Sequence, residues 1–449
     1  MEQFIINAAN FIWGTPLLIL LMGGGIFFTI YSKFLPFRYF RHAIDILRGK
    51  YDEEGEVGEI SHFEALSGHL AATIGMGNIS GVAVAIATGG PGAIFWMWVS
   101  AVFGITTKFF TCTLALMYRG KDSEGNIQGG PMYVIKEGMG KKWMPLAGLF
   151  CVAGFFGATP IFQANQIVQV TKDVILSPNQ WSFGSDFQTN LILGLMIATV
   201  TGAVIFGGIK RIATVAGKLV PLMVILYTMC VLYIMAVNYT EVIPNFLLII
   251  TDAFTAEAVL GGAVGAIIVA GARRAAFSNE AGIGTAPMMH GAATTNEPVR
   301  EGLVAMIGPV ADTLIVCTLT GLAILATGVW QNTELSGIAL TAQAFELAMP
   351  GFGPYILMIC VLIFALTTVF GMAYYSKKCL TFLVGVKNSK YFNYWYVILV
   401  MVGSITSLAV VVSFIDFMYA VMAFPTMISA IYLAPKVIKE AKRYFAALN

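Results

Sequence analysis

The segment Thr73-Ile74-Gly75-Met76-Gly77-Asn78-Ile79-Ser80-Gly81 lies within a hydrophobic stretch, residues 64–88, that is long enough to cross a lipid bilayer. Three glycines within seven residues, accompanied by Asn and Ser, disfavour a continuous helix. Unwound backbone at membrane depth is tolerated only where protein buries it or where it lines a wet cavity. Its freed carbonyls can bind a cation, and its freed N–H groups can bind a carboxylate. The segment therefore predicts a transporter whose site is built on a broken helix.

The composition is that of a protein that lies within a membrane. Of the 449 residues, 58% are hydrophobic and 11% are charged, whereas a soluble domain carries about 25% charged residues. A spanning helix needs roughly 20 mostly apolar residues. We therefore predict an all-α polytopic membrane protein, surrounded by membrane lipid, with eleven transmembrane helices at residues 11–31, 64–88, 92–117, 146–171, 190–207, 216–236, 255–276, 302–328, 353–376, 394–412 and 413–434.

Lysine and arginine residues follow the odd-numbered spans. With eleven spans, every Lys/Arg-rich loop and the C-terminal tail lie on one side of the membrane, Lys172 alone lies on the other, and Lys108 lies within a span. Because cytoplasmic loops carry the excess of positive charge, we expect a cytoplasmic C-terminus and an external N-terminus. The predicted location is the inner (plasma) membrane of the cell, crossed many times.

The spans divide into an additional helix and two sets of five. Residues 1–61 would hold the extra N-terminal helix and a cytoplasmic loop, and residues 435–449 a cytoplasmic tail. Residues 62–237 and 255–434 would form two repeats, which enter the membrane from opposite sides because five is odd. The first helix of the second repeat should then also be broken, and the sequence around Gly261-Gly262 and Gly265, followed by Gly271, is glycine-rich. The alternative role of these glycines is close helix packing.

Other classes of membrane protein fit less well. The sequence shows no nucleophile with an adjacent base and no metal-ligand cluster, so we do not expect an enzyme. A nucleotide-driven pump would need a phosphate-binding loop motif, which is absent from the sequence. No nucleic-acid partner is expected. A cation channel or leak pathway on the same fold is the alternative from another class, and the sequence does not indicate an oligomeric state.

Several motifs resemble the alanine/glycine:cation symporter family, also called sodium:alanine symporters. The motifs are spread in order over most of the chain: residues 71–83, Gly89-Gly90-Pro91-Gly92-Ala93, Gly129-Gly130-Pro131-Met132-Tyr133, residues 277–284 and Phe370-Gly371-Met372-Ala373-Tyr374-Tyr375. The resemblance implies the ten-helix inverted repeat of leucine-transporter-type proteins with one extra N-terminal helix. It also implies uptake of a small neutral amino acid driven by sodium or protons. We expect no buried carboxylate beside the broken helices, which favours Na⁺ over H⁺.

An amino acid substrate is a zwitterion that needs donors for its carboxylate and acceptors for its ammonium group. The amides of Gly75 and Gly77, at the start of a half-helix, would bind the carboxylate. Asn78 offers a donor and an acceptor, or caps that half-helix. Gln163 would face the substrate by resemblance, or join helices to one another. The complete predicted substrate set is Thr73, Gly75, Met76, Gly77, Asn78, Gln163, Gly262 and Met372.

The resemblance also implies a sodium site with oxygen ligands. Its ligands would be the carbonyls of Ala71, Ile74 and Phe364 and the hydroxyls of Thr367 and Thr368. A Thr-Thr pair alone is a weak signal, since threonine often bonds to its own helix.

Two methionines depart from the family pattern. Met76 stands where Thr or Ser is common, and Met372 stands where Trp is common. Flexible thioethers in place of a hydroxyl and an indole would enlarge the pocket, which predicts a substrate larger than alanine, such as glutamine or methionine. The alternative is that Met372 only fills the core. Within the spans, Lys108 and Asp312 are the deepest ionisable residues, and they could form a pair that gates the carrier or that is purely structural.

Overall fold

The computed structural model describes residues 2–254, 263–332 and 334–448. The regular secondary structure of the described chain is helical apart from the hairpin of β1 (Gly120–Lys121) and β2 (Ile127–Gln128) and one bridge between Ile60 and Ala293. Within these ranges, seven helices are long and apolar enough to cross a membrane, and two bent helix pairs could each supply one more span. The all-helical, polytopic class is confirmed, and the count of eleven spans stays a prediction.

The elements follow one another in three groups. The N-terminal group is α1 (Glu2–Ile12), α2 (Thr15–Leu18), η1 (Ile19–Gly23), α3 (Gly24–Tyr31), α4 (Leu35–Arg38) and α5 (Phe40–Leu47). The second group is α6 (His62–Thr73), η2 (Gly77–Gly81), α7 (Val82–Gly89), α8 (Gly92–Met117), β1, β2, α9 (Pro131–Tyr133), η3 (Val134–Met139), η4 (Lys141–Trp143), α10 (Met144–Gly157), α11 (Ile161–Thr171), η5 (Lys172–Leu176), α12 (Asp186–Ile205), α13 (Gly208–Val237) and α14 (Tyr239–Asp252). The third group is α16 (Ala263–Asn279), α17 (Ala286–His290), α18 (Pro298–Ala305), α19 (Ile307–Pro309), η6 (Val310–Cys317), α20 (Thr318–Ala326), η7 (Val329–Gln331), α21 (Ile338–Ala348), α22 (Gly353–Val384), η8 (Lys387–Tyr391), α23 (Phe392–Ile405) and α24 (Leu408–Leu448).

The first predicted break is confirmed. Helix α6 begins at a capping box, in which the Ser61 hydroxyl and the Glu64 side chain each accept from the other residue's backbone amide. The helix ends at Thr73, the backbone of Ile74 is extended, and the axis bends by 54° before η2 and α7. Gly75 donates its amide to the Asn78 side-chain oxygen at 2.9 Å. The Asn78 side chain therefore holds the turn that precedes its own half-helix, whereas the N-cap residue Met76 has no side-chain cap, so the predicted capping role of Asn78 is not observed.

The predicted second break lies partly outside the described residues, which omit Gly261 and Gly262, and the break that the structure shows lies further along the chain. Helix α16 runs without interruption through Gly265 and Gly271 to Asn279, and Gly262 lies outside the described residues. The helix stops where Glu280, Gly282 and Gly284 adopt positive φ angles of 56°, 85° and 106°, and α17 follows. Gly271 serves close packing instead, because a Cβ there would lie 2.5 Å from the carbonyl oxygen of Ala93.

Two further helix boundaries differ in detail from the prediction. The last two predicted spans, 394–412 and 413–434, were divided near residue 413, whereas α23 ends at Ile405 and α24 begins at Leu408. Asp416 therefore lies inside α24, fully buried, where its carboxylate accepts from Arg273 at 2.8 Å and Arg274 at 2.5 Å. Two arginine partners compensate the charge of this carboxylate in the absence of water.

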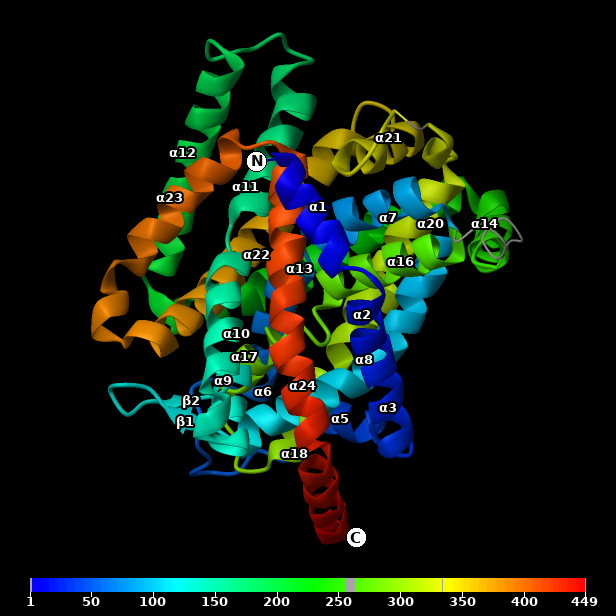
Figure 1. Ribbon diagram of the computed structural model, residues 1–449. Coiled ribbons are helices and arrows are strands. Elements are labelled where there is room, and N and C mark those ends of the chain that lie inside the picture. The colour runs from blue at the N-terminus through cyan, green and yellow to red at the C-terminus, as the bar shows by residue number, and fades with distance from the viewer. Residues whose placement is uncertain (1, 255–262, 333, 449) are drawn as a thin grey trace.

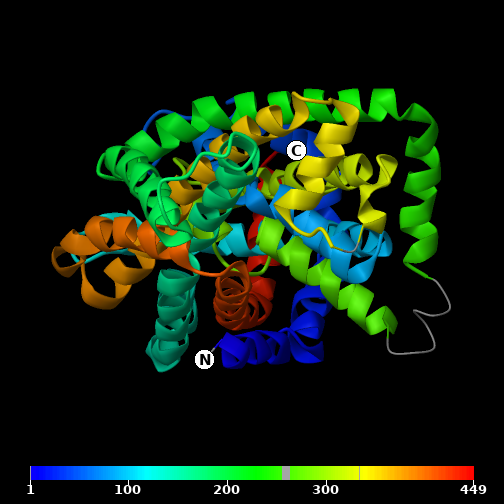
Figure 2. The same ribbon diagram turned by 90° about the horizontal axis from the view of Figure 1, so that it is seen from above.

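The two termini lie at opposite ends of the molecule (Figure 1), as an odd number of spans would require. The C-terminus shares its end with α5, α18 and the β1–β2 hairpin, whereas α21 and the loop joining η5 to α12 lie at the other end. In the view from above (Figure 2), α13 runs along one side of the molecule and α14 runs along the adjoining side. At both breaks the residues are buried, apart from the partly buried Ala281, so both breaks lie inside the protein.

Candidate transport site

Asp312 connects the two broken helices. Its carboxylate accepts from the Asn78 side-chain amide at 2.8 Å and from the Ser278 hydroxyl at 2.7 Å, and also from Thr313 at 2.7 Å. Asn78 follows the first break and Ser278 precedes the second. Asp312 is fully buried in η6. The expectation that no carboxylate would lie beside the breaks is therefore wrong, although an acidic residue inside an apolar span was itself a signal of this contact.

A second carboxylate, Glu280, stands at the second break itself. It is 1% exposed, and it accepts from the Tyr419 hydroxyl at 2.9 Å and from the Thr285 hydroxyl. The Tyr419 hydroxyl also lies 3.7 Å from the sulfur of Met372. This contact joins a predicted substrate residue to the second break. Sequence reasoning missed Glu280 because the break was expected earlier in the chain.

Most of the predicted sodium ligands meet at the first break. The Thr368 hydroxyl donates to the carbonyls of Ala71 at 3.2 Å and Phe364 at 2.9 Å. The Thr367 hydroxyl lies 3.0 Å from the Phe364 carbonyl and 2.9 Å from that of Ile363. A Cβ on Gly75 would lie 2.2 Å from the Thr368 hydroxyl, so only glycine permits this approach. Ile74 provides the extended turn between Ala71 and Gly75.

This donor set fits a monovalent hard cation. Carbonyl and hydroxyl oxygens are the neutral ligands that hard cations accept. The carbonyl of Ala71 belongs to the last turn of α6, where carbonyls have no partner within the helix. The Thr368 hydroxyl can rotate its proton away from Ala71 and present a lone pair to an ion. The buried oxygens could therefore exchange a hydrogen bond for a cation without moving the backbone.

The predicted substrate residues fall into two groups. The Asn78 side chain is taken up by Gly75 and Asp312, and the Thr73 hydroxyl bonds to the His69 carbonyl at 3.1 Å. Met76, Met372 and Gln163 are buried, and the Gln163 side-chain oxygen finds no hydrogen-bond partner among the described residues. An unpaired buried acceptor is costly. A bound substrate that donated a hydrogen bond to the Gln163 oxygen would remove this cost.

Gly77 lies where the two breaks approach each other. A Cβ on Gly77 would lie 3.3 Å from both the Phe277 ring and the Cα of Ser278. The Phe277 ring also packs edge-on against Phe162, the neighbour of Gln163, with ring centroids 5.4 Å apart. Gly77 and Phe162 therefore both lie against Phe277 beside the second break, and the substrate-binding roles of Met76, Gly77 and Gln163 stay predictions. Gly262 cannot be placed, because it lies outside the described residues.

Lys108 has a different partner from the one considered first. Its ammonium group contacts the ring nitrogen Nε2 of His69, whose Nδ1 lies 3.2 Å from the Tyr375 hydroxyl. In the described part of the chain, no ion pair joins Lys108 to Asp312. The two residues therefore belong to neighbouring but separate hydrogen-bonded groups.

The broken helices are also joined at the end that bears the C-terminus. The Glu59 amide donates to the Ala292 carbonyl at 2.8 Å, and the Thr294 amide donates to the Ile60 carbonyl at 2.7 Å. Arg119 donates to carbonyls on both sides of this junction, including those of Val57 at 2.9 Å and Thr295 at 3.1 Å. Burial lowers the pKa of the Arg119 guanidinium, and its carbonyl partners replace the lost water. These bonds therefore close the junction between the start of α6 and the end of α17.

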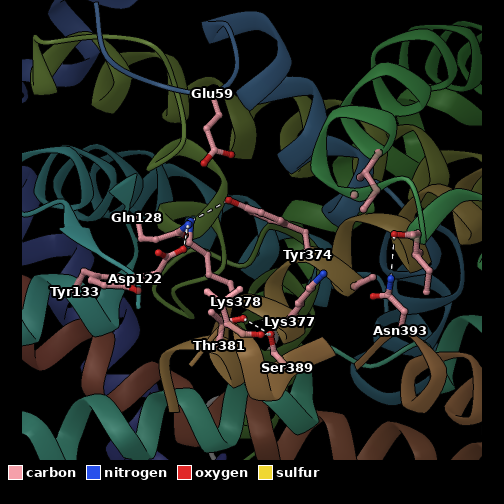
Figure 3. A pocket seen from close by; sticks show the side chains of 15 residues that line it. Glu59, Asp122, Gln128, Tyr133, Tyr374, Lys377, Lys378, Thr381, Ser389 and Asn393 are labelled. Carbon is pink, nitrogen blue, oxygen red and sulfur yellow. Dashed lines mark hydrogen bonds between the residues drawn. The ribbon is translucent and has the colours of Figure 1, made fainter. Parts of the chain in front are cut away.

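A cavity of about 210 Å³ opens beside this closure (Figure 3). It lies between the hairpin, the start of α13 and the second half of α22, and it is lined by both amines and carboxylates, among them Lys377, Lys378, Glu59 and Asp122. The Lys378 amine donates to the Tyr374 hydroxyl and to the Met288 carbonyl, each at 2.9 Å. Ala373, next to Met372, also lines it. The cavity therefore borders the part of α22 that follows Met372.

Comparison with known proteins identifies the family of the chain. The model of the sodium:alanine symporter family matches residues 1–449. The chain belongs to the sodium:alanine symporter family. It is 40% identical to the sodium/alanine symporter AgcS of Methanococcus maripaludis, over 98% of this chain and 96% of that protein. It is 36% identical to the probable sodium/glutamine symporter GlnT of Bacillus subtilis, over 98% of this chain and 90% of that one.

The fold is similar to that of a solved transporter. The structure of MhsT in complex with L-phenylalanine superposes with a TM-score of 0.63 at 14% sequence identity, covering 84% of this chain and 90% of the other. At that identity the likeness concerns the fold alone. Family membership makes the chain a multi-pass transporter, not an enzyme, within a family of sodium-coupled amino acid symporters.

Proposed function

We propose that this symporter couples the inward movement of Na⁺ to the uptake of a neutral amino acid, which binds between the two broken helices. The observation that carries the proposal is the Thr368 hydroxyl, which joins the freed carbonyl of Ala71 to that of Phe364 across two helices. A purely structural threonine would need only the bond within its own helix.

The proposed sodium ligands are the carbonyls of Ala71, Ile74 and Phe364 and the hydroxyls of Thr367 and Thr368. Bound Na⁺ would hold α6 against α22 and fix the turn that contains Gly75. Because the same turn presents the amides proposed to bind the substrate carboxylate, ion binding and substrate binding would each favour the other. This reciprocity is the physical basis of symport.

The proposed substrate is a neutral amino acid of the alanine/glycine class or a larger one such as glutamine. The Gly77 amide would bind the carboxylate, the Gly75 amide would join it by exchanging its bond to the Asn78 oxygen for one to the substrate, and Gln163 would accept from the ammonium group. Met76 and Met372 would contact the side chain. One of the two relatives is named for alanine and the other for glutamine, which supports this range of substrate sizes.

The proposed mechanism is alternating access between two five-helix repeats, residues 62–237 and 255–434, with the N-terminal helix of residues 1–61 outside the repeats. Eleven spans, an external N-terminus and a cytoplasmic C-terminus in the inner membrane complete the proposal. Its support is the charge distribution together with the placement of the termini at opposite ends (Figure 1). The closed junction around Arg119 would then face the cytoplasm.

Proton coupling is a second candidate because of Glu280 and Asp312. Both carboxylates are buried at the breaks, where a proton could move with the substrate. A relative with 36% identity, from Bacillus subtilis, is named as a putative sodium/proton-dependent alanine carrier. The oxygen cluster at Thr368 favours Na⁺ as the principal coupling ion.

Uptake into proteoliposomes tests the proposal. Labelled alanine, glycine and glutamine are offered with an inward Na⁺ gradient, with a pH gradient, and with neither. We expect accumulation above the external concentration with the Na⁺ gradient only. Accumulation with the pH gradient alone would assign the coupling to protons, and flux that only equilibrates would indicate a channel or leak pathway.

A further inference from the structure

Glu301, in α18, holds two histidines by its two carboxylate oxygens. The Nδ1 atom of His290 lies 2.5 Å from one oxygen, and the Nδ1 atom of His62 contacts the other. Glu301 and His290 are fully buried, and His62 is 3% exposed. Each histidine therefore uses one ring nitrogen on the same carboxylate, out of reach of water.

The two histidines come from different broken helices. His62 is the first residue of α6 and His290 is the last residue of α17. These helix ends are the ones joined by the Ile60–Ala293 bridge. Since Glu301 stands on α18, the three side chains connect both half-helices to a third element at the closed end. Separation of the half-helices would pull at least one histidine from the carboxylate.

The charge of this cluster depends on bound protons. A carboxylate with two neutral imidazoles leaves one negative charge buried, which is costly without a cation. One additional proton turns an imidazole into an imidazolium, and the hydrogen bond to the carboxylate becomes charge-assisted and stronger. The second ring nitrogens of both histidines are buried without a partner among the residues described. A neutral His62 that donates from Nδ1 to Glu301 keeps its Nε2 unprotonated, so this nitrogen is the atom at which the ring can take the additional proton.

Other ionisable groups face the cluster from the neighbouring elements. The ring of His69, on α6, has its centroid 5.5 Å from that of His290. In the preceding loop, Asp52 and Glu56 interact electrostatically with His62. On the α8 side, Arg119 and Cys112 interact electrostatically with Glu301. The Lys378 amine donates to the Met288 carbonyl of α17. Arg300, next to Glu301, is paired with Glu53 and Glu56 instead.

We propose that Glu301, His62 and His290 form a proton-binding site, in which one proton holds the α6 and α17 ends against α18. The proton would be taken up when the cytoplasmic end closes and released when it opens to water. This inference rests on the proposed cytoplasmic orientation and on alternating access. Because the closed form binds one more proton than the open form, acid stabilises closure and opening increases as the pH rises, by at most about tenfold per pH unit.

Hydrogen exchange of the purified full-length protein tests the proposal without substrate or sodium, so its outcome does not depend on the transport assay. The amides of Glu59, Thr294 and Thr295 are bonded across the junction, and they exchange only when the ends separate. After correction for the intrinsic pH dependence of exchange, we expect opening at these amides to increase from acid to alkaline pH. Opening that is independent of pH in the unmodified protein would overturn the proposal.

Three variants then identify the site. Glu301→Gln keeps the volume but removes the charge, and His62→Asn keeps a donor near Nδ1 but cannot take the proton. Either should lose the pH dependence of opening. The matched control is His42→Asn, since His42 bonds to the Tyr444 hydroxyl at 2.8 Å on α24, outside the cluster; it should retain the pH dependence. Unchanged dependence in both cluster variants would also overturn the proposal.

Discussion

At the scale of single residues, Thr368 is the side chain on which the proposed ion site depends most. Thr368→Val keeps the shape and removes the hydroxyl that reaches both Ala71 and Phe364. Loss of one neutral oxygen ligand should cost about 1–1.5 kcal/mol, or roughly a tenfold rise in the Na⁺ concentration for half-maximal uptake. The control is Thr327→Val, because that hydroxyl bonds only to carbonyls of its own helix. Equal Na⁺ dependence in both variants would contradict the proposed ligand.

Met372 tests the size of the substrate pocket at the same scale. Met372→Trp would place a rigid indole where a flexible thioether now contacts the Tyr419 hydroxyl. We expect glutamine uptake to fall relative to alanine uptake by roughly 10–200-fold, the usual effect of small volume changes on selectivity. The measurement is the ratio of kcat/KM for the two amino acids. An unchanged ratio would mean that Met372 only fills the core.

At the scale of elements, Asp312 holds the two broken helices together. Asp312→Asn would place an amide donor among the Asn78, Ser278 and Thr313 donors. At least one buried donor loses its acceptor, so we expect a loss of about 1–3 kcal/mol in stability, seen as a lower Tm. The control Asp186→Asn alters an exposed pair with Lys172 and should change Tm little. A similar Tm for both variants would refute this role.

The element scale also shows what the sequence could and could not predict. The break after Thr73 was predictable because glycine, Asn and Ser interrupt an otherwise apolar span. The break after Asn279 was not predictable in the same way, because glycine can serve either packing or unwinding. Gly271 packs against Ala93, whereas Gly282 and Gly284 supply the positive φ angles. Contacts between distant segments, such as Glu301 with His62 and Glu280 with Tyr419, have no local signature and required the fold.

At the scale of the whole molecule, the orientation in the membrane decides which end opens to which compartment. The six native cysteines are buried, so a cysteine introduced at an exposed position should be the main target of a membrane-impermeant thiol reagent. Ser177, in the loop after η5, and Glu124, in the hairpin, are exposed. That loop and the hairpin lie at opposite ends of the molecule (Figure 1). The two residues form a matched pair of labelling sites.

We expect Ser177→Cys to be labelled on intact cells and Glu124→Cys only after the membrane is permeabilised. The physical reason is that the hairpin shares its end with the Lys/Arg-rich loops, which remain in the cytoplasm. The unmodified protein gives the background labelling, and uptake by each variant shows that it is folded. The reverse pattern would place the Arg119 junction and the Glu301 cluster outside the cell, so their protons would then come from the external medium. Labelling of both sites on intact cells would require an even number of spans between them. It would therefore contradict the single span predicted between residues 124 and 177.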